Sequence, residues 1–196
     1  WLNTLQKPLG NQQGSKCGFK FVATHVDFYK TYKEIEKDKA TVKVGDLKHF
    51  ESLADAGSGK FLGVLRMDVD ELNDLCNIGL QSSSITKFIS LSFDIELFFT
   101  GYFHELCETE FIDNIYVGYS GGDDLFVIGA WDQMVELACQ ARKDFQLFTC
   151  KNHDIHITGR IILCKETYPL HLAAQQAGEL LDKMAKENEQ QQKNLQ

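Results

Sequence analysis

The sequence predicts an α+β fold in which helices cover one face of an antiparallel sheet. Short apolar runs typical of strands alternate along the chain with longer segments of helical spacing. Between two of the strand-like runs stands Ser-Gly-Gly-Asp-Asp, which is long enough for a hairpin turn and nothing larger. Hydrophobic residues make up 43% of the 196 residues, which suffices for a domain of ordinary size with its own core.

The first strand is expected at residues 61–67, where the nearly continuous apolar run fits a strand buried on both faces. A helix follows, because the serines at 82–84 are good N-caps. Its apolar stripe is predicted from residues at helical spacing: Ile85, Phe88, Ile89, Ile95, Phe99 and Tyr102.

The second half of the fold repeats this pattern. Strands are expected at 115–119 and 125–128, a helix at 131–148, a strand at 155–163 and a last helix beyond Pro169. Strand, helix, hairpin, helix and strand in this order is the ferredoxin-like, split βαβ plan. That plan places the two crossover helices on the same face of the sheet.

The chain is expected to have three parts. Residues 1–57 are interpreted as an ancillary N-terminal segment with a short strand around 19–23 and a helix near 31–38. Residues 58–187 hold the domain described above. Residues 188–196 lack an apolar face and are expected to fray.

The charge balance excludes one class of function. There are 20 Lys and Arg residues against 28 Asp and Glu residues, so the formal net charge is −8. Non-specific binding of nucleic acid needs an excess of basic residues, which this chain lacks. An acidic chain can still bind an anionic substrate through metal ions held by its carboxylates.

The cysteines and the hydropathy predict a cytoplasmic protein. The six cysteines form no C-x-x-C pair, and most stand in apolar-patterned segments, which is typical of reduced, buried thiols. No apolar run reaches the roughly 18 residues of a membrane span. We therefore expect no membrane partner.

Two acidic groups mark the candidate site. Asp68 and Asp70 stand at the end of the first strand, and Asp123 and Asp124 stand at the tip of the hairpin. In the split βαβ plan these strands are neighbours, so the two groups meet at one edge of the sheet. Converging carboxylates repel each other unless a cation neutralises them, and Mg²⁺ prefers such oxygen ligands. Asp70 is open to two interpretations. It is either a metal ligand or a residue that supports one, or else an acidic residue at the surface or at the start of a helix.

The glycines of the hairpin fit the same chemistry. Without a Cβ atom, Gly121 and Gly122 let a triphosphate approach backbone N–H groups. Two metal ions about 3.5–4 Å apart can activate an attacking hydroxyl and stabilise a leaving pyrophosphate. The residues thus predict metal-dependent nucleotidyl transfer on a nucleoside triphosphate. The alternative is a solvated hairpin, because Gly and Asp are common in turns.

Three segments also resemble a known family. Residues 63–70 (GVLRMDVD), 119–125 (YSGGDDL) and 177–181 (AGELL) are similar to the catalytic palm of the large signature subunit of type III CRISPR effector complexes. The resemblance covers about residues 50–186. It implies a palm that condenses ATP into cyclic oligoadenylates when the complex binds target RNA. It also implies partner effector subunits, through which guide RNA and target RNA are mainly contacted.

The resemblance assigns roles to individual residues. Asp68, Asp123 and Asp124 become the catalytic carboxylates, and together with Val69 they become the ligands of two Mg²⁺ or Mn²⁺ ions. Ser120 stands where the family contacts adenine, next to the glycines that bind the nucleotide. Lys186 resembles a lysine that meets the triphosphate of the substrate ATP, although a solvated lysine at a helix end is an equal interpretation.

Two other functions stay open. A GGDEF-type diguanylate cyclase shares the acidic hairpin, but Glu71-Leu72-Asn73 and Asp124-Leu125 depart from its usual motifs. A non-catalytic scaffold palm that docks effector subunits would keep the fold without the activity. Binding of metal and ATP separates a scaffold from an enzyme.

Overall fold

The structure is a computed structural model of the chain. It describes residues 23–27, 30, 43–70, 72, 85–111, 113–153 and 155–193, with the backbone alone for residues 23, 24, 182 and 184–193. The expected helix at 31–38 and the expected strand before Ala23 lie outside the described residues.

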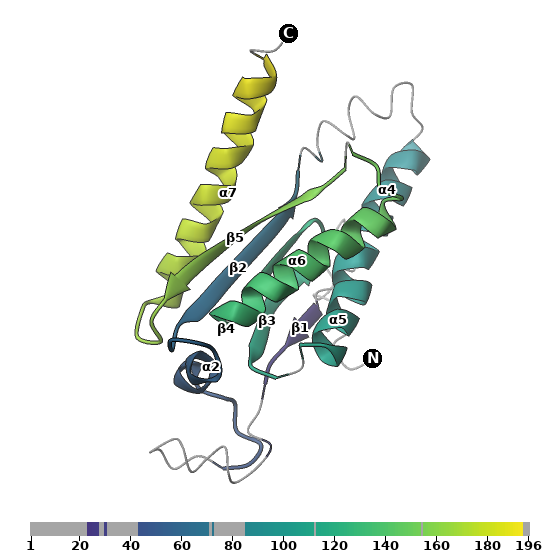
Figure 1. Ribbon diagram of the computed structural model, residues 1–196. Coiled ribbons are helices and arrows are strands. Elements are labelled where there is room, and N and C mark those ends of the chain that lie inside the picture. The colour runs from purple at the N-terminus through teal and green to yellow at the C-terminus, as the bar shows by residue number, and fades with distance from the viewer. Residues whose placement is uncertain are drawn as a thin grey trace, which may run out of the picture.

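The centre of the molecule is a five-stranded antiparallel sheet (Figure 1). Its strands lie in the order β1 (Ala23–His25), β3 (Ile115–Gly121), β4 (Asp124–Ala130), β2 (Leu62–Val69) and β5 (Ile157–Cys164). The last four have the order of the split βαβ plan, which confirms the predicted α+β topology. Strand β2 lies between β4 and β5, so its end is held on both sides.

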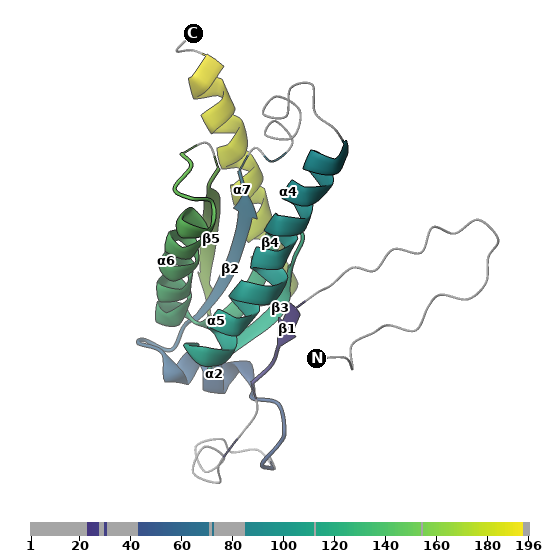
Figure 2. The same cartoon turned by 90° about the vertical axis from the view of Figure 1, so that its right-hand side faces the viewer.

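One face of the sheet carries the two crossover connections (Figure 2). The first is formed by α4 (Ile85–Leu97), a π-helical turn, η2 (Phe98–Tyr102), and α5 (Phe103–Thr109); the second is α6 (Trp131–Phe148). Buried side chains of these helices pack against alternate residues of β2, namely Leu65, Met67 and Val69. The crossover helices therefore share one face, as the plan predicts.

The opposite face is covered as well. Helices α2 (Phe50–Ala56) and α7 (Leu170–Lys193) pack there, and a second core joins Leu53 and Ala173 to Leu62 and Val64 of β2. The predicted arrangement, with helices on one face of the sheet, is thus incomplete. Strand β2 has apolar residues on both faces, and helices cover both. Helix α7 also continues to Lys193, past the point where its sequence loses an apolar face.

The predicted apolar stripe of α4 is partly wrong. Ile95 and Phe99 are buried in the core, whereas Ile85, Phe88 and Ile89 are exposed, Ile85 by 78%. The first turns of α4 extend beyond the sheet that the stripe would have packed against (Figures 1 and 2).

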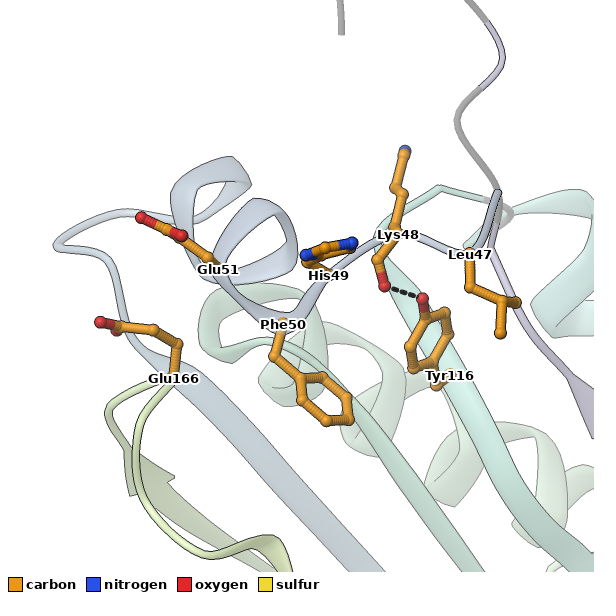
Figure 3. A pocket seen from close by; sticks show the side chains of 7 residues that line it. All are labelled: Leu47, Lys48, His49, Phe50, Glu51, Tyr116 and Glu166. Atoms are coloured by element: carbon orange, nitrogen blue, oxygen red, sulfur yellow. Dashed lines mark hydrogen bonds between the residues drawn. The ribbon is translucent and has the colours of Figure 1, made fainter. Parts of the chain in front are cut away.

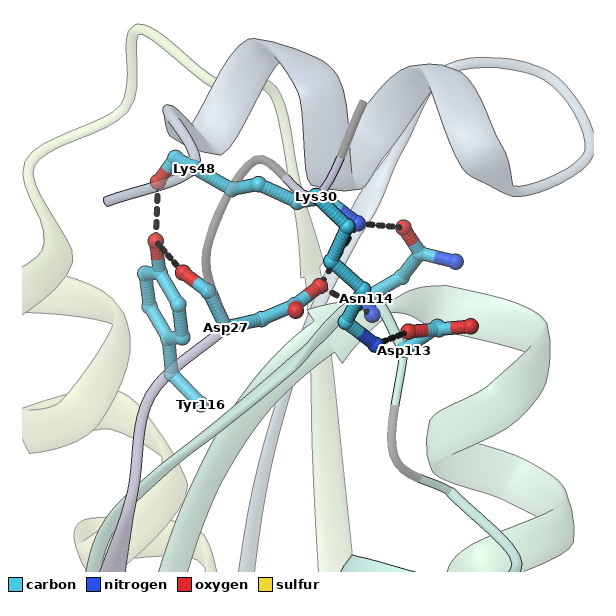
Figure 4. Close-up of polar contacts among 6 residues, drawn as sticks. All are labelled: Asp27, Lys30, Lys48, Asp113, Asn114 and Tyr116. Atoms are coloured by element: carbon cyan, nitrogen blue, oxygen red, sulfur yellow. Dashed lines mark hydrogen bonds and ion pairs between the residues drawn. The ribbon is translucent and has the colours of Figure 1, made fainter. Parts of the chain in front are cut away.

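Described parts of the predicted ancillary segment lie on the sheet. Strand β1 pairs with β3 and forms one edge of the sheet. A buried ion pair joins Asp27 Oδ2 to Lys48 Nζ at 2.7 Å, and the main-chain N–H of Asn114 donates to the same Asp27 oxygen at 2.8 Å. The Tyr116 hydroxyl donates to the main-chain oxygen of Lys48, and Lys30 pairs with Asp113 nearby (Figure 4). These contacts hold Asp27, Lys30 and Lys48 at the start of β3.

The cysteines differ from expectation in their burial. Cys107 and Cys164 are buried free thiols, whereas Cys139 and Cys150 are free and exposed. Cys139 stands in the apolar stretch of α6 but on the side of the helix that faces solvent. In the described residues, every helix is too short or too polar to span a membrane.

Candidate active site

The end of β2 meets the hairpin tip and the start of β5. Asp68 lies opposite Asp124 on one side and Thr158 on the other. Beyond it, the main-chain N–H of Val69 donates to the main-chain carbonyl of Asp123 at 3.0 Å. The two acidic groups of the sequence therefore lie side by side at one end of the sheet.

Crowding of negative charge is visible at Asp68. Partial burial, and next to it the neighbouring carboxylates of Asp123, Asp124 and Asp70, together raise the pKa of its carboxyl from 3.8 to about 6. A cation between these groups would relieve the repulsion.

The donors fit a hard divalent cation, because they are carboxylates whose mutual repulsion a cation would offset. Within the parts of the chain that the structure describes, no three Asp, Glu, His or Cys side chains are grouped as a metal-binding set. Val69 can offer a main-chain oxygen and no more, since its side chain is apolar and buried.

Asp124 has a cationic neighbour that the sequence analysis did not single out. Its Oδ2 lies 3.6 Å from Nη2 of Arg66, on β2. Phe126, which lies opposite Arg66 on β4, packs with the core beneath α2 and α7, so this pair lies on the face that α7 covers. One feature of the sequence could have identified Arg66, because it is the charged residue within the apolar run of residues 62–67.

Asp70 is turned toward β5. Its Oδ2 accepts a hydrogen bond from the Thr158 hydroxyl and lies 3.3 Å from Nε2 of His156. The Asp70 main-chain N–H donates to the His156 carbonyl at 3.0 Å. Of the interpretations left open by the sequence, these contacts favour a supporting residue that holds β2 and β5 together beside Asp68.

Ser120 lies in the core, on the other face of the sheet. Its side chain is fully buried, and its hydroxyl donates to the main-chain oxygen of Phe99 at 2.6 Å. Phe99 belongs to the π-helical turn, in which the Phe103 N–H bonds to the Phe98 carbonyl five residues earlier. Ser120 thus connects the hairpin to the crossover helix.

The glycines form the tip of the hairpin. Gly121 is the last residue of β3, and its carbonyl accepts from the Tyr119 hydroxyl at 2.5 Å. Gly122 has a φ of 70°, a left-handed conformation that favours glycine. Lys186 lies in α7, where the backbone alone is described, so its predicted role stays a prediction.

A small hollow of about 170 Å³ opens beside the hairpin tip. Gly122 and Asp123 line it together with Leu72 and Ile95, and Ser92 and Glu96 of α4 complete the lining. Its position next to Asp123 could not be read from the sequence, because α4 reaches the hairpin through the tertiary fold alone.

A larger hollow of about 470 Å³ lies at the opposite end of the sheet (Figure 3). It is lined by Phe50, Tyr116, Glu51 and Glu166, among other residues. The rings of Phe50 and Tyr116 are packed edge to face, with their centroids 5.8 Å apart. None of the predicted site residues lines it. The acidic cluster and this hollow are therefore separate features.

Comparisons with known proteins agree with the palm-like fold. The model of the family described as Cas10/Cmr2, second palm domain, matches residues 61–195. The CRISPR system single-strand-specific deoxyribonuclease Cas10/Csm1 (subtype III-A) of Methanocaldococcus jannaschii is 37% identical over 132 residues. This match covers 62% of the chain and 16% of that protein, so the chain spans a small part of that relative's length.

Solved structures show the same likeness. A Csm1–Csm4 cassette in complex with cA4 matches with a TM-score of 0.67 and 30% identity, over 85% of this chain and 24% of that one. A Csm1–Csm4 cassette in complex with AMPPNP matches with a TM-score of 0.67 and 30% identity, over 85% and 23%.

Proposed function

The chain belongs to the family of Cas10/Cmr2 second palm domains, and from this membership we propose that it is a nucleotidyltransferase palm that converts ATP to cyclic oligoadenylates within a type III CRISPR complex. The observation that carries the proposal is the meeting of Asp68 with Asp123 and Asp124 at the end of β2. Complexes of the similar Csm1–Csm4 cassette with AMPPNP and cA4 support both the substrate and the product.

The carboxylates of Asp68, Asp123 and Asp124, with the main-chain oxygen of Val69, would hold two Mg²⁺ or Mn²⁺ ions. Such ions lower the pKa of an attacking hydroxyl and stabilise the leaving pyrophosphate. The raised pKa of Asp68 supports this assignment, because it reflects negative charge that a bound cation would balance.

Other residues of the chain orient the nucleotide. The left-handed turn at Gly122 would let the triphosphate approach the backbone, and Lys186 would add a positive charge toward it. The hollow lined by Leu72 and Ile95 would take an apolar part of the nucleotide beside Asp123. Ser120 would act on the adenine side through the position of the hairpin, since its hydroxyl already donates to Phe99.

The proposed partners are the other subunits of a type III effector complex, which would make most contacts with guide and target RNA. The net charge of −8 agrees with this division, because RNA binding requires basic residues. The Csm1–Csm4 cassettes are solved examples of such an assembly. A cytoplasmic location follows from this role.

The test is the product formed from ATP and Mn²⁺ by the protein assembled with its effector subunits and target RNA. We expect oligoadenylates by mass spectrometry, and none after the double substitution Asp123→Ala and Asp124→Ala. The matched control is Asp94→Ala, which removes an exposed carboxylate of α4. Unchanged yield from the double variant contradicts the proposal.

Turnover of GTP in this assay and a binding measurement separate the alternatives. Preferential turnover of GTP to a cyclic dinucleotide would indicate a diguanylate cyclase. Absence of Mn²⁺ and ATP binding by calorimetry would indicate a scaffold palm.

A further inference from the structure

We propose that Arg66 is a positioning residue for Asp124, and that Gly178 of α7 provides the space in which the Arg66 guanidinium lies. This inference rests on the proposed function, because it assigns Asp124 to the reacting site. It adds a residue on β2 and a contact with α7 that the acidic motifs do not include.

The guanidinium of Arg66 lies between α7 and the acidic cluster. Its Nη2 faces Asp124 Oδ2 at 3.6 Å. On the other side, a Cβ atom placed on Gly178 would come within 2.5 Å of its Nη1. Because Cβ atoms never approach nitrogen so closely, a side chain at residue 178 would move the guanidinium away from its present place.

Within the described part of the chain, Arg66 is the one neighbour that requires glycine at position 178. It stands in the interior of α7, where glycine lowers helix stability relative to alanine. Its neighbour Ala177 is fully buried against the sheet, so this turn of α7 is the part of the helix seated on β2 and β5. Among the described residues, the atoms that crowd the absent Cβ all belong to Arg66.

The surroundings of Arg66 direct it toward Asp124. Across the sheet, its partner on β5 is Arg160, a like charge that disfavours a turn in that direction. Nη2 of Arg160 is itself buried without a hydrogen-bond partner among the described residues. The partner on β4 is Phe126, one pleat from Asp124. Of these neighbours, the Asp124 carboxylate is therefore the one that attracts the Arg66 guanidinium.

The chemical consequence concerns orientation. Asp124 stands among carboxylates that repel it, and the Arg66 cation 3.6 Å away favours positions of the Asp124 side chain that face it. An arginine offers a planar group whose donors have fixed directions, which a lysine ammonium lacks. The packing of α7 against the sheet therefore determines, through Arg66, the orientation of the Asp124 side chain.

The kinetic test compares Arg66→Met, Arg66→Lys and Gly178→Ala in the assembled complex. We expect kcat to fall about tenfold or more in Arg66→Met and Gly178→Ala while KM for ATP changes less than about threefold, because positioning acts on the transition state. Arg66→Lys should restore part of the loss. Arg142→Met, at an exposed arginine of α6, and Gly101→Ala, whose Cβ would meet a single leucine carbon at 3.4 Å, are the matched controls.

Thermal unfolding distinguishes positioning from simple damage to the fold. The guanidinium is the end of a flexible side chain, so Gly178→Ala should leave the melting temperature unchanged or raise it while kcat falls. A lower melting temperature that parallels the loss of activity would contradict the proposal. So would an increase in KM at constant kcat, which would make Arg66 a substrate contact.

A spectroscopic measurement on the chain itself requires no catalysis. We expect the side-chain N–H resonance of Arg66, assigned by its loss in Arg66→Lys, to move in both Asp124→Asn and Gly178→Ala and to stay in Gly101→Ala. An unmoved resonance in the first two variants overturns the inference. If the wild-type complex makes no oligoadenylate, the proposed function fails, and this measurement still decides whether the Arg66 guanidinium lies between Gly178 and Asp124.

Discussion

The main-chain N–H of Val69 donates to the main-chain carbonyl of Asp123 at 3.0 Å, which ties the end of β2 to the tip of the β3–β4 hairpin. This hydrogen bond lies between the two acidic motifs of the sequence. Because it joins backbone to backbone, it holds the motifs together independently of the carboxylate charges. The fold thus brings together negative charges that repel each other.

The first prediction follows from this repulsion. Burial and the neighbouring carboxylates raise the pKa of Asp68 from 3.8 to about 6, so the folded protein holds a proton that the unfolded chain has released over this range. The contribution of Asp68 to stability therefore falls as the pH rises from 3.8 to about 6, and the penalty is complete above that range.

We expect Asp68→Asn to raise the free energy of unfolding by ~1 kcal/mol at about pH 8, allowing for solvent screening of this partly exposed group, and to have little effect at about pH 4. Urea unfolding in metal-free buffer measures both values. Asp94→Asn, at an exposed carboxylate, is the control. Equal effects at both pH values would contradict the linkage to Asp68.

The second prediction concerns the buried hydroxyl of Ser120. Ser120→Ala removes the hydrogen bond to the Phe99 carbonyl and leaves that acceptor in the core. We expect a loss of ~1–3 kcal/mol in the free energy of unfolding, because an unpaired buried polar group keeps its desolvation penalty. Thr109→Ala removes a hydroxyl bond to the Glu105 carbonyl on an exposed turn, and it should cost clearly less. Similar losses for both variants would exclude the buried contact as the cause.

Ser120 also shows where prediction from sequence ends. The hairpin and its strands follow from the Gly-Gly-Asp-Asp turn, but the register of β3 shifts between Val117 and Tyr119. Such a bulge changes which face each later side chain occupies. Ser120 therefore points into the core while Asp124 lies on the face of α7, a separation that residue spacing could not reveal.

Tertiary contacts set a similar limit elsewhere. The bounds of α6 agree with the predicted helix at 131–148, since its apolar stripe matches a helix that lies along the sheet. The stripe of α4 is equally regular, yet its first turns extend beyond the sheet. The pairing of Arg66 with Asp124 depends on how α7 packs against the sheet, and no local sequence pattern predicts this packing.

A third prediction follows from the two ends of α4. Ile89→Ala, at a side chain exposed by 58%, should change the free energy of unfolding by less than ~0.5 kcal/mol. Ile95→Ala, at a side chain exposed by 3%, should lower it by ~2–5 kcal/mol, because it leaves a cavity in the core. Denaturant unfolding of the chain compares the two. A large loss at Ile89 would show that this end of α4 is packed in solution.

The last prediction concerns the ion pair of Asp27 and Lys48, whose side chains are 2% and 5% exposed. Lys48→Met leaves a buried carboxylate without its cation, and we expect a loss of ~3–5 kcal/mol in the free energy of unfolding. Lys60→Met breaks a pair with Asp55 of similar length, 2.9 Å, on the surface, and should cost much less. Adding Asp27→Leu to Lys48→Met should recover much of the loss, because the penalty arises from the burial of the Asp27 charge rather than from the missing attraction. If the double variant is less stable than Lys48→Met alone, the hydrogen bond that Asp27 accepts from Asn114 outweighs the burial of its charge.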